Sequence, residues 1–112
     1  MVKQKPFGRS HGILMPIFSL DSPYGIGTLG KPAEEFVDFL CRAKANMWQM
    51  LPIGPTGYGN SPYQCFSAFA GNSYFLNPWW FFEKGWISKK ELVLFEKENN
   101  LKVDYGWLYK TR

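Results

Sequence analysis

Carboxylates are the first residues to consider, because a well-placed pair can act as general acid and nucleophile. The chain has nine Asp and Glu residues, and six of them lie on, or at the start of, two amphipathic segments. Solvated helix faces explain such positions. No pair is placed for acid and nucleophile chemistry, so we expect no catalytic residue in this chain. The nine are Asp21, Glu34, Glu35, Asp38, Glu83, Glu91, Glu96, Glu98 and Asp104.

Other residues that could carry chemistry are few. His11 is the only histidine, which leaves little material for a histidine relay or a metal site. Cys65 has only His11 as a candidate base and is expected to be a buried structural thiol, and its spacing from Cys41 matches no zinc pattern. The run Gly25–Gly30 resembles a dinucleotide-binding fingerprint, but it lies too far from Phe18 for the required tight turn, and the expected acidic residue is missing. We therefore expect no metal and no cofactor.

The feature that indicates binding is an uncharged segment from Ala45 to Phe82. It contains no Asp, Glu, Lys or Arg, yet it holds eleven aromatic residues, four Pro and four Gly. A solvated loop does not explain this composition. It indicates either burial under other parts of a protein or a surface for a neutral, partly apolar ligand.

Hydrophobic patterning predicts a βαβ unit that would position this segment. We expect a buried strand at 13–18, a loop at 19–30, a helix of about fourteen residues with Pro32 at its first position, and a strand at 47–51. The two strands would be parallel and joined by a right-handed crossover. The inner face of the helix would carry Phe36, Val37, Leu40 and Cys41.

The neutral segment continues beyond this unit. A long loop, 54–77, follows the carboxyl end of the second strand, where α/β folds bind their ligands. A further helix is marked by a capping box at Ser88–Glu91 and is expected to reach Asn99 or Asn100.

Length and composition restrict the class of protein. The chain has 112 residues, a formal charge of +4 and 46% hydrophobic residues, which excludes intrinsic disorder. No apolar run reaches the roughly 18 residues of a membrane span, and Met1–Pro6 is not followed by the apolar core of a secretory signal. We expect a cytoplasmic protein. Two strands cannot close a barrel of eight, so the chain reads as the opening portion of a larger fold.

A motif of more than twenty residues carries a family resemblance. The stretch 51–72 reads LPIGPTGYGNSPYQCFSAFAGN, with Gly8–Gly30 before it and Val103–Tyr109 after it. Together they closely resemble the N-terminal part of the 4-alpha-glucanotransferases, the amylomaltases or disproportionating enzymes, over residues of about 7–109. The departures are small: Asn60 stands where the family usually has Asp, Cys65 where it has Ser, and Asp21 where Pro is common, and 77–80 replaces a more ordinary run.

The resemblance implies an α/β fold, with the chain forming the first βαβ unit of a TIM (β/α)8 barrel, a long substrate-binding loop and a following helix. It implies transfer of an α-1,4-glucan segment by a retaining mechanism, with carboxyl groups roughly 5–5.5 Å apart. None of the family's catalytic carboxylates maps onto residues 1–112, which would be an N-terminal fragment of the catalytic barrel and no complete domain. The implied substrate-binding residues are Asn60, Ser61, Tyr63 and Gln64.

The resemblance also implies a second glucan-binding surface, built from Tyr58 and Tyr109. An alternative for Tyr63 is that it packs under the loop, and one for Tyr109 is that it shares an ordinary helix face with Tyr105 and Leu108. The expected partners are α-1,4-glucans such as maltodextrin and amylose. Neutral glucans suit a loop rich in Tyr, Phe, Asn, Gln and Ser that carries no charge.

Two other functions compete with this interpretation. A single-stranded nucleic-acid binder fits a pI near 9.1, but it requires Lys and Arg among its stacking aromatics, and 45–82 has none. We expect neither a nucleic-acid nor a membrane partner. A free-standing carbohydrate-binding module without catalysis would share the same aromatic site. We expect the isolated chain to be inactive, because no catalytic carboxylate maps onto it. We also expect it to be poorly soluble, because the apolar residues 79–82, Phe36 and Leu40 would lack packing partners.

Overall fold

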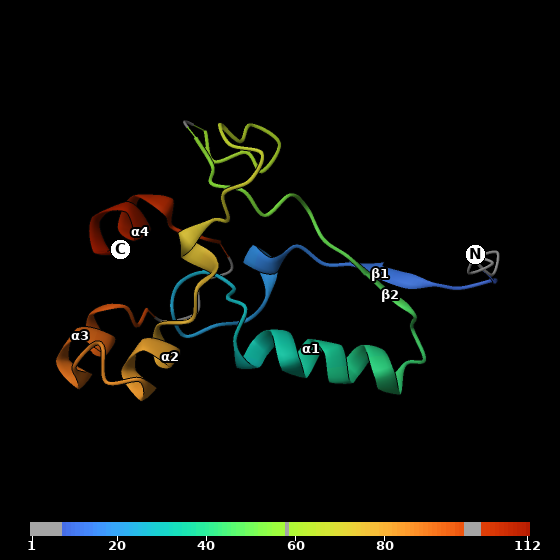
Figure 1. Ribbon diagram of the computed structural model, residues 1–112, viewed down its shortest axis with the longest axis horizontal. Helices are drawn as coiled ribbons and strands as arrows, with labels where there is room; N and C mark the ends of the chain where they lie inside the picture. Colours follow the sequence, from blue (N-terminus) through green and yellow to red (C-terminus); the bar gives the residue numbers. More distant parts are fainter. Residues whose placement is uncertain (1–7, 58, 98–101) are drawn as a thin grey trace, which may run out of the picture.

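The computed structural model describes residues 8–57, 59–97 and 102–112, and it has the form of an elongated body measuring 52 × 32 × 31 Å (Figure 1). A strand pair and the long helix α1 lie at one end of the long axis, and three short helices lie at the other. Between them, residues of the long loop project away from α1.

The predicted βαβ unit is confirmed. Strand β1 (Gly12–Leu14) pairs in parallel with β2 (Met47–Gln49), with Ile13 opposite Trp48, and α1 (Lys31–Arg42) connects them. Both strands are shorter than predicted. Pro16 has no N–H to pair and begins a 3₁₀ turn, η1 (Ile17–Ser19), so the expected strand 13–18 ends at Leu14.

Helix α1 starts one residue earlier than predicted, at Lys31 after Gly30, so Pro32 is its second residue. Fewer of its side chains are buried than the hydrophobic pattern predicted. Ala33 and Leu40 are buried, whereas Val37, at 44% exposure, and Cys41 are exposed. The ring of Phe36 lies 5.0 Å from that of Trp48, measured between centroids, which places α1 against one face of the strand pair. The expectation that Phe36 and Leu40 lack partners is therefore wrong.

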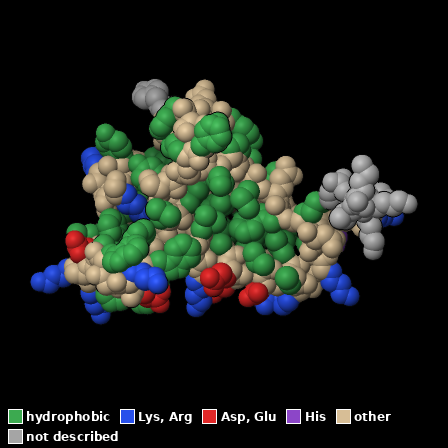
Figure 2. Space-filling model, in the orientation of Figure 1, with side chains coloured by type: hydrophobic (Ala, Val, Ile, Leu, Met, Phe, Trp, Pro, Cys, Tyr) green, Lys and Arg blue, Asp and Glu red, His purple; other side chains and the backbone are tan. Residues whose placement is uncertain are grey.

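The other face of the strand pair is open. Side chains alternate along a strand, so Ile13 and Trp48 are half-buried while Leu14 and Met47 are each 53% exposed. Figure 2 shows hydrophobic side chains gathered in the centre of this view, bordered below by charged side chains. Parallel strands are normally covered on both faces, so the open face of the strand pair, with Leu14 and Met47, is a place where further structure would pack.

Four further elements follow β2: η2 (Ser73–Phe75), α2 (Pro78–Glu83), α3 (Lys89–Leu94) and α4 (Tyr105–Thr111). Helix α2 was not predicted, although its sequence carries a signal: Asn77 caps the helix by accepting a hydrogen bond from the Trp79 N–H, and Pro78 occupies its first turn.

The capping box at Ser88 and Glu91 is confirmed, with the Ser88 N–H donating to the Glu91 carboxylate at 2.7 Å. The predicted end of this helix is wrong, since α3 stops at Leu94. Lys97 instead pairs with the loop after η1, where its N–H donates to the Pro23 carbonyl at 2.8 Å. Asn99 and Asn100 lie outside the described residues.

The core forms where distant segments meet, and Trp48 of β2 packs against it. Ile17, Ile26, Phe75 and Leu108 come from η1, the loop 19–30, η2 and α4, and Leu108 is 0% exposed. Much of the loop 19–30 is consequently buried, including Tyr24 and Thr28. No helix within the described ranges is long and apolar enough to cross a membrane.

Gly27 is required by the close packing of this loop, because a Cβ atom there would collide with the Ile17 carbonyl oxygen. We predict that Gly27→Ala lowers the free energy of unfolding by about 1–3 kcal/mol, the usual effect of overpacking. Gly71→Ala is the matched control, because a Cβ at Gly71 meets nothing within 4 Å. Thermal unfolding followed by tryptophan fluorescence measures both, and equal midpoints for the two variants would contradict the prediction.

Candidate functional site

The uncharged residues 54–72 form a loop closed at its base, which we call the aromatic loop. The Asn72 N–H donates to the Ile53 carbonyl at 2.8 Å, and Thr56 forms an isolated antiparallel bridge with Cys65. In Figure 1 this loop stands apart from the helices, in green and yellow. This hydrogen bond and this bridge hold the two sides of the loop together near its base. The residues between Thr56 and Cys65 therefore form a short two-sided projection, which we call the ribbon.

Cys65 locks the base of the aromatic loop. Its thiol donates to the Ser67 carbonyl at 2.6 Å and accepts a hydrogen bond from the Ser67 N–H at 3.4 Å. A Cβ atom at Gly54 would collide with Sγ of Cys65, so the sulfur fills the space that this glycine leaves. The thiol is thus part of the packing, as predicted, but it is half-buried where full burial was expected.

The four predicted substrate-binding residues lie on two consecutive turns at the tip of the ribbon. The Asn60 N–H donates to the Gly57 carbonyl at 3.1 Å, and the Gln64 N–H donates to the Ser61 carbonyl at 3.1 Å. Asn60 has a φ of 56°, a left-handed conformation that Asn adopts more readily than most residues. The Ser61 hydroxyl accepts from the Tyr63 N–H at 3.3 Å.

These residues are open to solvent. Tyr63 is 72% exposed, and Asn60 and Gln64 are also exposed, while Ser61 is half-buried. The alternative that Tyr63 packs under the loop is therefore wrong. The aromatic ring and the neighbouring polar groups form an open surface on which a neutral ligand can lie. That these four residues contact a glucan stays a prediction.

Sequence reasoning did not single out two further aromatic residues of this loop. Phe66 is 77% exposed and Phe69 is 101% exposed. The signal was present, because Tyr63, Phe66 and Phe69 follow one another at intervals of three in a segment without charge. Only the structure shows that these side chains point to solvent instead of filling a core.

Tyr109 lies on α4 and is 81% exposed, whereas Leu108 beside it is fully buried. It therefore does not share the buried helix face to which Leu108 belongs, which removes the alternative interpretation of this residue. Tyr58 lies outside the described residues. The pairing of Tyr58 with Tyr109 stays a prediction.

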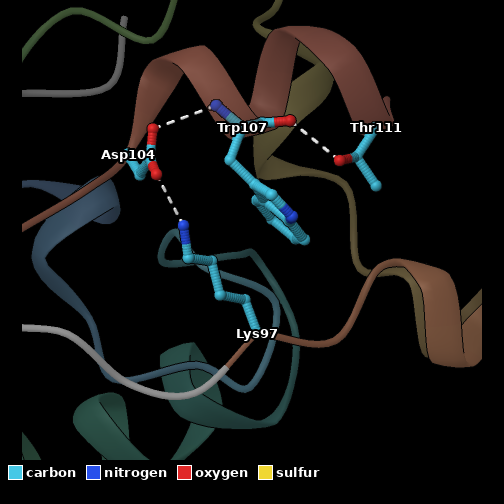
Figure 3. A network of polar contacts seen from close by, with 4 residues as sticks. All are labelled: Lys97, Asp104, Trp107 and Thr111. Atoms are coloured by element: carbon cyan, nitrogen blue, oxygen red, sulfur yellow. Dashed lines mark hydrogen bonds and ion pairs between the residues drawn. The ribbon is translucent and has the colours of Figure 1, made fainter.

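A polar network holds the start of α4 (Figure 3). Lys97 Nζ contacts Asp104 Oδ2 at 2.6 Å and lies 5.0 Å from the centroid of the Trp107 ring. Asp104 caps the helix by accepting from the Trp107 N–H at 3.0 Å, and the Thr111 hydroxyl donates to the Trp107 carbonyl at 2.8 Å. The hydrogen bond from Lys97, followed by that from Trp107, lowers the pKa of the Asp104 carboxyl.

The structure brings Asp21 and Asp104 to one hollow of about 500 Å³, between the loop 18–27 and residues 102–105. Asp104 is unsuited to general acid catalysis there, because the contacts that lower its pKa favour the ionised carboxylate. Among the described residues, no group of three His, Cys, Asp or Glu side chains could hold a metal ion.

Comparison with known proteins decides the family. The family model for 4-alpha-glucanotransferase matches residues 15–112. The chain belongs to the 4-alpha-glucanotransferase family. It is 47% identical over 106 residues to the 4-alpha-glucanotransferase of Streptococcus pneumoniae and 46% identical over 101 residues to that of Thermus thermophilus.

These matches cover 93% and 90% of this chain but only 21% and 19% of the two relatives, so the chain spans about a fifth of their length. A solved structure, described as an amylomaltase from Streptococcus agalactiae in complex with acarbose, resembles the chain with a TM-score of 0.86 and 40% identity. That match covers 94% of this chain and 21% of the other. The fold of this 4-alpha-glucanotransferase family member is thus that of the corresponding part of an amylomaltase.

The packing of Cys65 on Gly54 gives a test of the aromatic loop. We predict that Gly54→Ala destabilises this family member by about 1–3 kcal/mol through overpacking. It should also speed chymotrypsin cleavage after Tyr63, Phe66 and Phe69, because the base of the loop opens. Removing the sulfur with Cys65→Ala should reduce the effect of Gly54→Ala, since the two residues are in contact.

Gly57→Ala is the control, because a Cβ at Gly57 meets its nearest atom at 3.7 Å. Limited proteolysis with mass spectrometry and thermal unfolding together measure these effects. If Gly54→Ala has the same effect in the parent chain and in the Cys65→Ala variant, the thiol does not lock the loop.

Proposed function

We propose that this chain supplies glucan-binding surface to a 4-alpha-glucanotransferase, which transfers a segment of an α-1,4-glucan to a new acceptor sugar. Membership of the family carries the proposal, together with an exposed aromatic loop without a charged residue. Glucosyl rings are neutral: their C–H faces pack on aromatic rings, and their hydroxyl groups exchange hydrogen bonds with amide and hydroxyl side chains. A neutral surface suits such a ligand.

The proposed place of the chain in the enzyme is the first βαβ unit of a (β/α)8 barrel with its substrate-binding loop. The parallel β1–β2 pair, the crossover by α1 and a long loop after the carboxyl end of β2 support this assignment. The open apolar face of the strand pair, with Leu14 and Met47 exposed, would then face the barrel interior. A free-standing carbohydrate-binding module has no such requirement for an open sheet face.

Within the reaction, residues of this chain would bind and orient the glucan. Tyr63 would pack on a glucosyl ring near the cleavage point, while Asn60, Ser61 and Gln64 would take hydrogen bonds from sugar hydroxyls. The retaining mechanism needs a nucleophilic carboxylate and a carboxylic acid roughly 5–5.5 Å apart, and by resemblance both come from other parts of the barrel. Tyr58 and Tyr109 would hold a glucan away from the bond that is cut.

A chimaera tests the proposed function directly. We predict that the Streptococcus pneumoniae relative stays active when this chain replaces its matching 106-residue segment, at 47% identity. Incubation with maltotriose should then yield glucose and longer maltodextrins, while the 112-residue chain alone should yield neither, because by resemblance the acid and the nucleophile come from other parts of the barrel. A folded but inactive chimaera, or turnover by the chain alone, would overturn the proposal.

Tyr63 is the sharpest single test of the substrate-binding turn. In the chimaera, Tyr63→Ala should reduce kcat/KM on maltotriose by an amount equivalent to about 1–3 kcal/mol, because a ring contact and a hydrogen bond are lost together. Tyr63→Phe should lose less, since it keeps the ring. Trp86→Ala, at a residue 71% exposed outside the aromatic loop, is the control. Unchanged kinetics for Tyr63→Ala with normal stability would place Tyr63 outside the site.

A further inference from the structure

Three exposed aromatic rings follow one another along the aromatic loop, and only Tyr63 has a proposed role. Phe66 and Phe69 have exposed fractions of 77% and 101%, which are unusual for side chains that carry no polar group. Their positions are well defined by the backbone. The Ser67 hydroxyl accepts hydrogen bonds from the Phe69 N–H at 3.3 Å and from the Ala70 N–H at 3.1 Å, and Cys65 holds Ser67 on both its N–H and its carbonyl.

The bridge between Thr56 and Cys65 places Phe66 beside the proposed substrate-binding residues. Cys65 pairs with Thr56 across the ribbon, and its sulfur points inward against Gly54. Gln64 and Phe66 flank Cys65 in the chain, and both side chains are exposed. Both residues also border Gly57, because a Cβ atom there would lie 3.7 Å from the Gln64 carbonyl oxygen and 4.0 Å from Cδ1 of Phe66.

The opposite side of the ribbon leaves room for a ligand. Gly57 has no side chain, and a Cβ there would lie 4.0 Å from Cδ1 of the Phe66 ring. The ring thus lies next to bare backbone, and most of its surface is open to solvent. No Asp, Glu, Lys or Arg occurs between Ala45 and Phe82, so nothing charged competes for this surface or favours a charged ligand.

We propose that Phe66 and Phe69 form a stacking surface for α-glucans, extending the site of Tyr63 and Gln64 along the aromatic loop. The ligand class is a neutral chain of glucosyl residues, whose apolar ring faces cover the two phenyl rings. This inference rests on the proposed function for its ligand. It differs from that function in its residues, because neither phenylalanine can donate or accept a conventional hydrogen bond, so stacking is the contribution they make.

The experiment measures glucan binding by the 112-residue chain itself and by the chimaera. Native electrophoresis in gels containing amylose gives the dissociation constant from the retardation of each variant. Phe66→Ala and Phe69→Ala should each raise this constant about threefold to tenfold, the effect of one lost ring contact. Phe66→Tyr and Phe69→Tyr should bind within about twofold of the parent, because they keep a ring that stacks.

Trp86→Ala is the matched control, since Trp86 is nearly as exposed as Phe66, at 71%, but lies between α2 and α3. Unchanged amylose binding by both alanine variants would overturn the inference. So would variants that unfold at lower temperature and whose tyrosine counterparts fail to restore binding, because that pattern identifies rings that pack against other parts of the protein. The chimaera separates the two proposals: an inactive chimaera that still loses amylose binding on Phe66→Ala contradicts the transferase function and supports the stacking surface.

Discussion

Leu108 of α4 packs with no exposed surface against Ile17, Ile26 and Phe75. Each of these residues comes from a different short segment, and none of the four segments could stay folded alone. Full burial of side chains of this size contributes about 1.5–3 kcal/mol each, which is the main favourable term available to such short pieces. The loop 19–30, η1, η2 and α4 are all positioned by this one contact set.

Polar contacts then fix the orientation of what the core brings together. The side chain of Lys97 forms an ion pair with Asp104, the N-cap of α4, and its backbone N–H donates to Pro23 in the loop 19–30. Lys97 therefore connects the helix to that loop. Arg112 donates to the Tyr74 carbonyl at 2.8 Å and so joins the last residue after α4 to η2. These contacts fix the orientation of α4, with Leu108 on its buried side and Tyr109 exposed on its outer side.

The aromatic loop is stabilised differently from the core. Its apolar rings are exposed, and its backbone is held by bonds from Cys65, Ser61 and Ser67 to near neighbours. Such local bonds keep the ribbon ordered without burying the rings. A surface organised before binding loses less conformational entropy when a ligand arrives, which is how a few exposed rings can give useful affinity for a neutral sugar chain.

The amino-acid sequence by itself determined the parallel βαβ unit, the placement of Pro32 in the first turn of α1, the capping box at Ser88 and the family, because each depends on local spacing or on a long motif. It also indicated that the uncharged segment either binds a neutral ligand or is buried under other parts of the protein. Only the tertiary structure decided which rings are buried within this chain: Phe75 is buried against Leu108, while Phe66 and Phe69 are exposed. The end of α3 and the burial of 19–30 were likewise decided by contacts between residues far apart in the chain, such as Lys97 with Pro23. Local patterns carry no information about such distant partners, so periodicity alone could not place them.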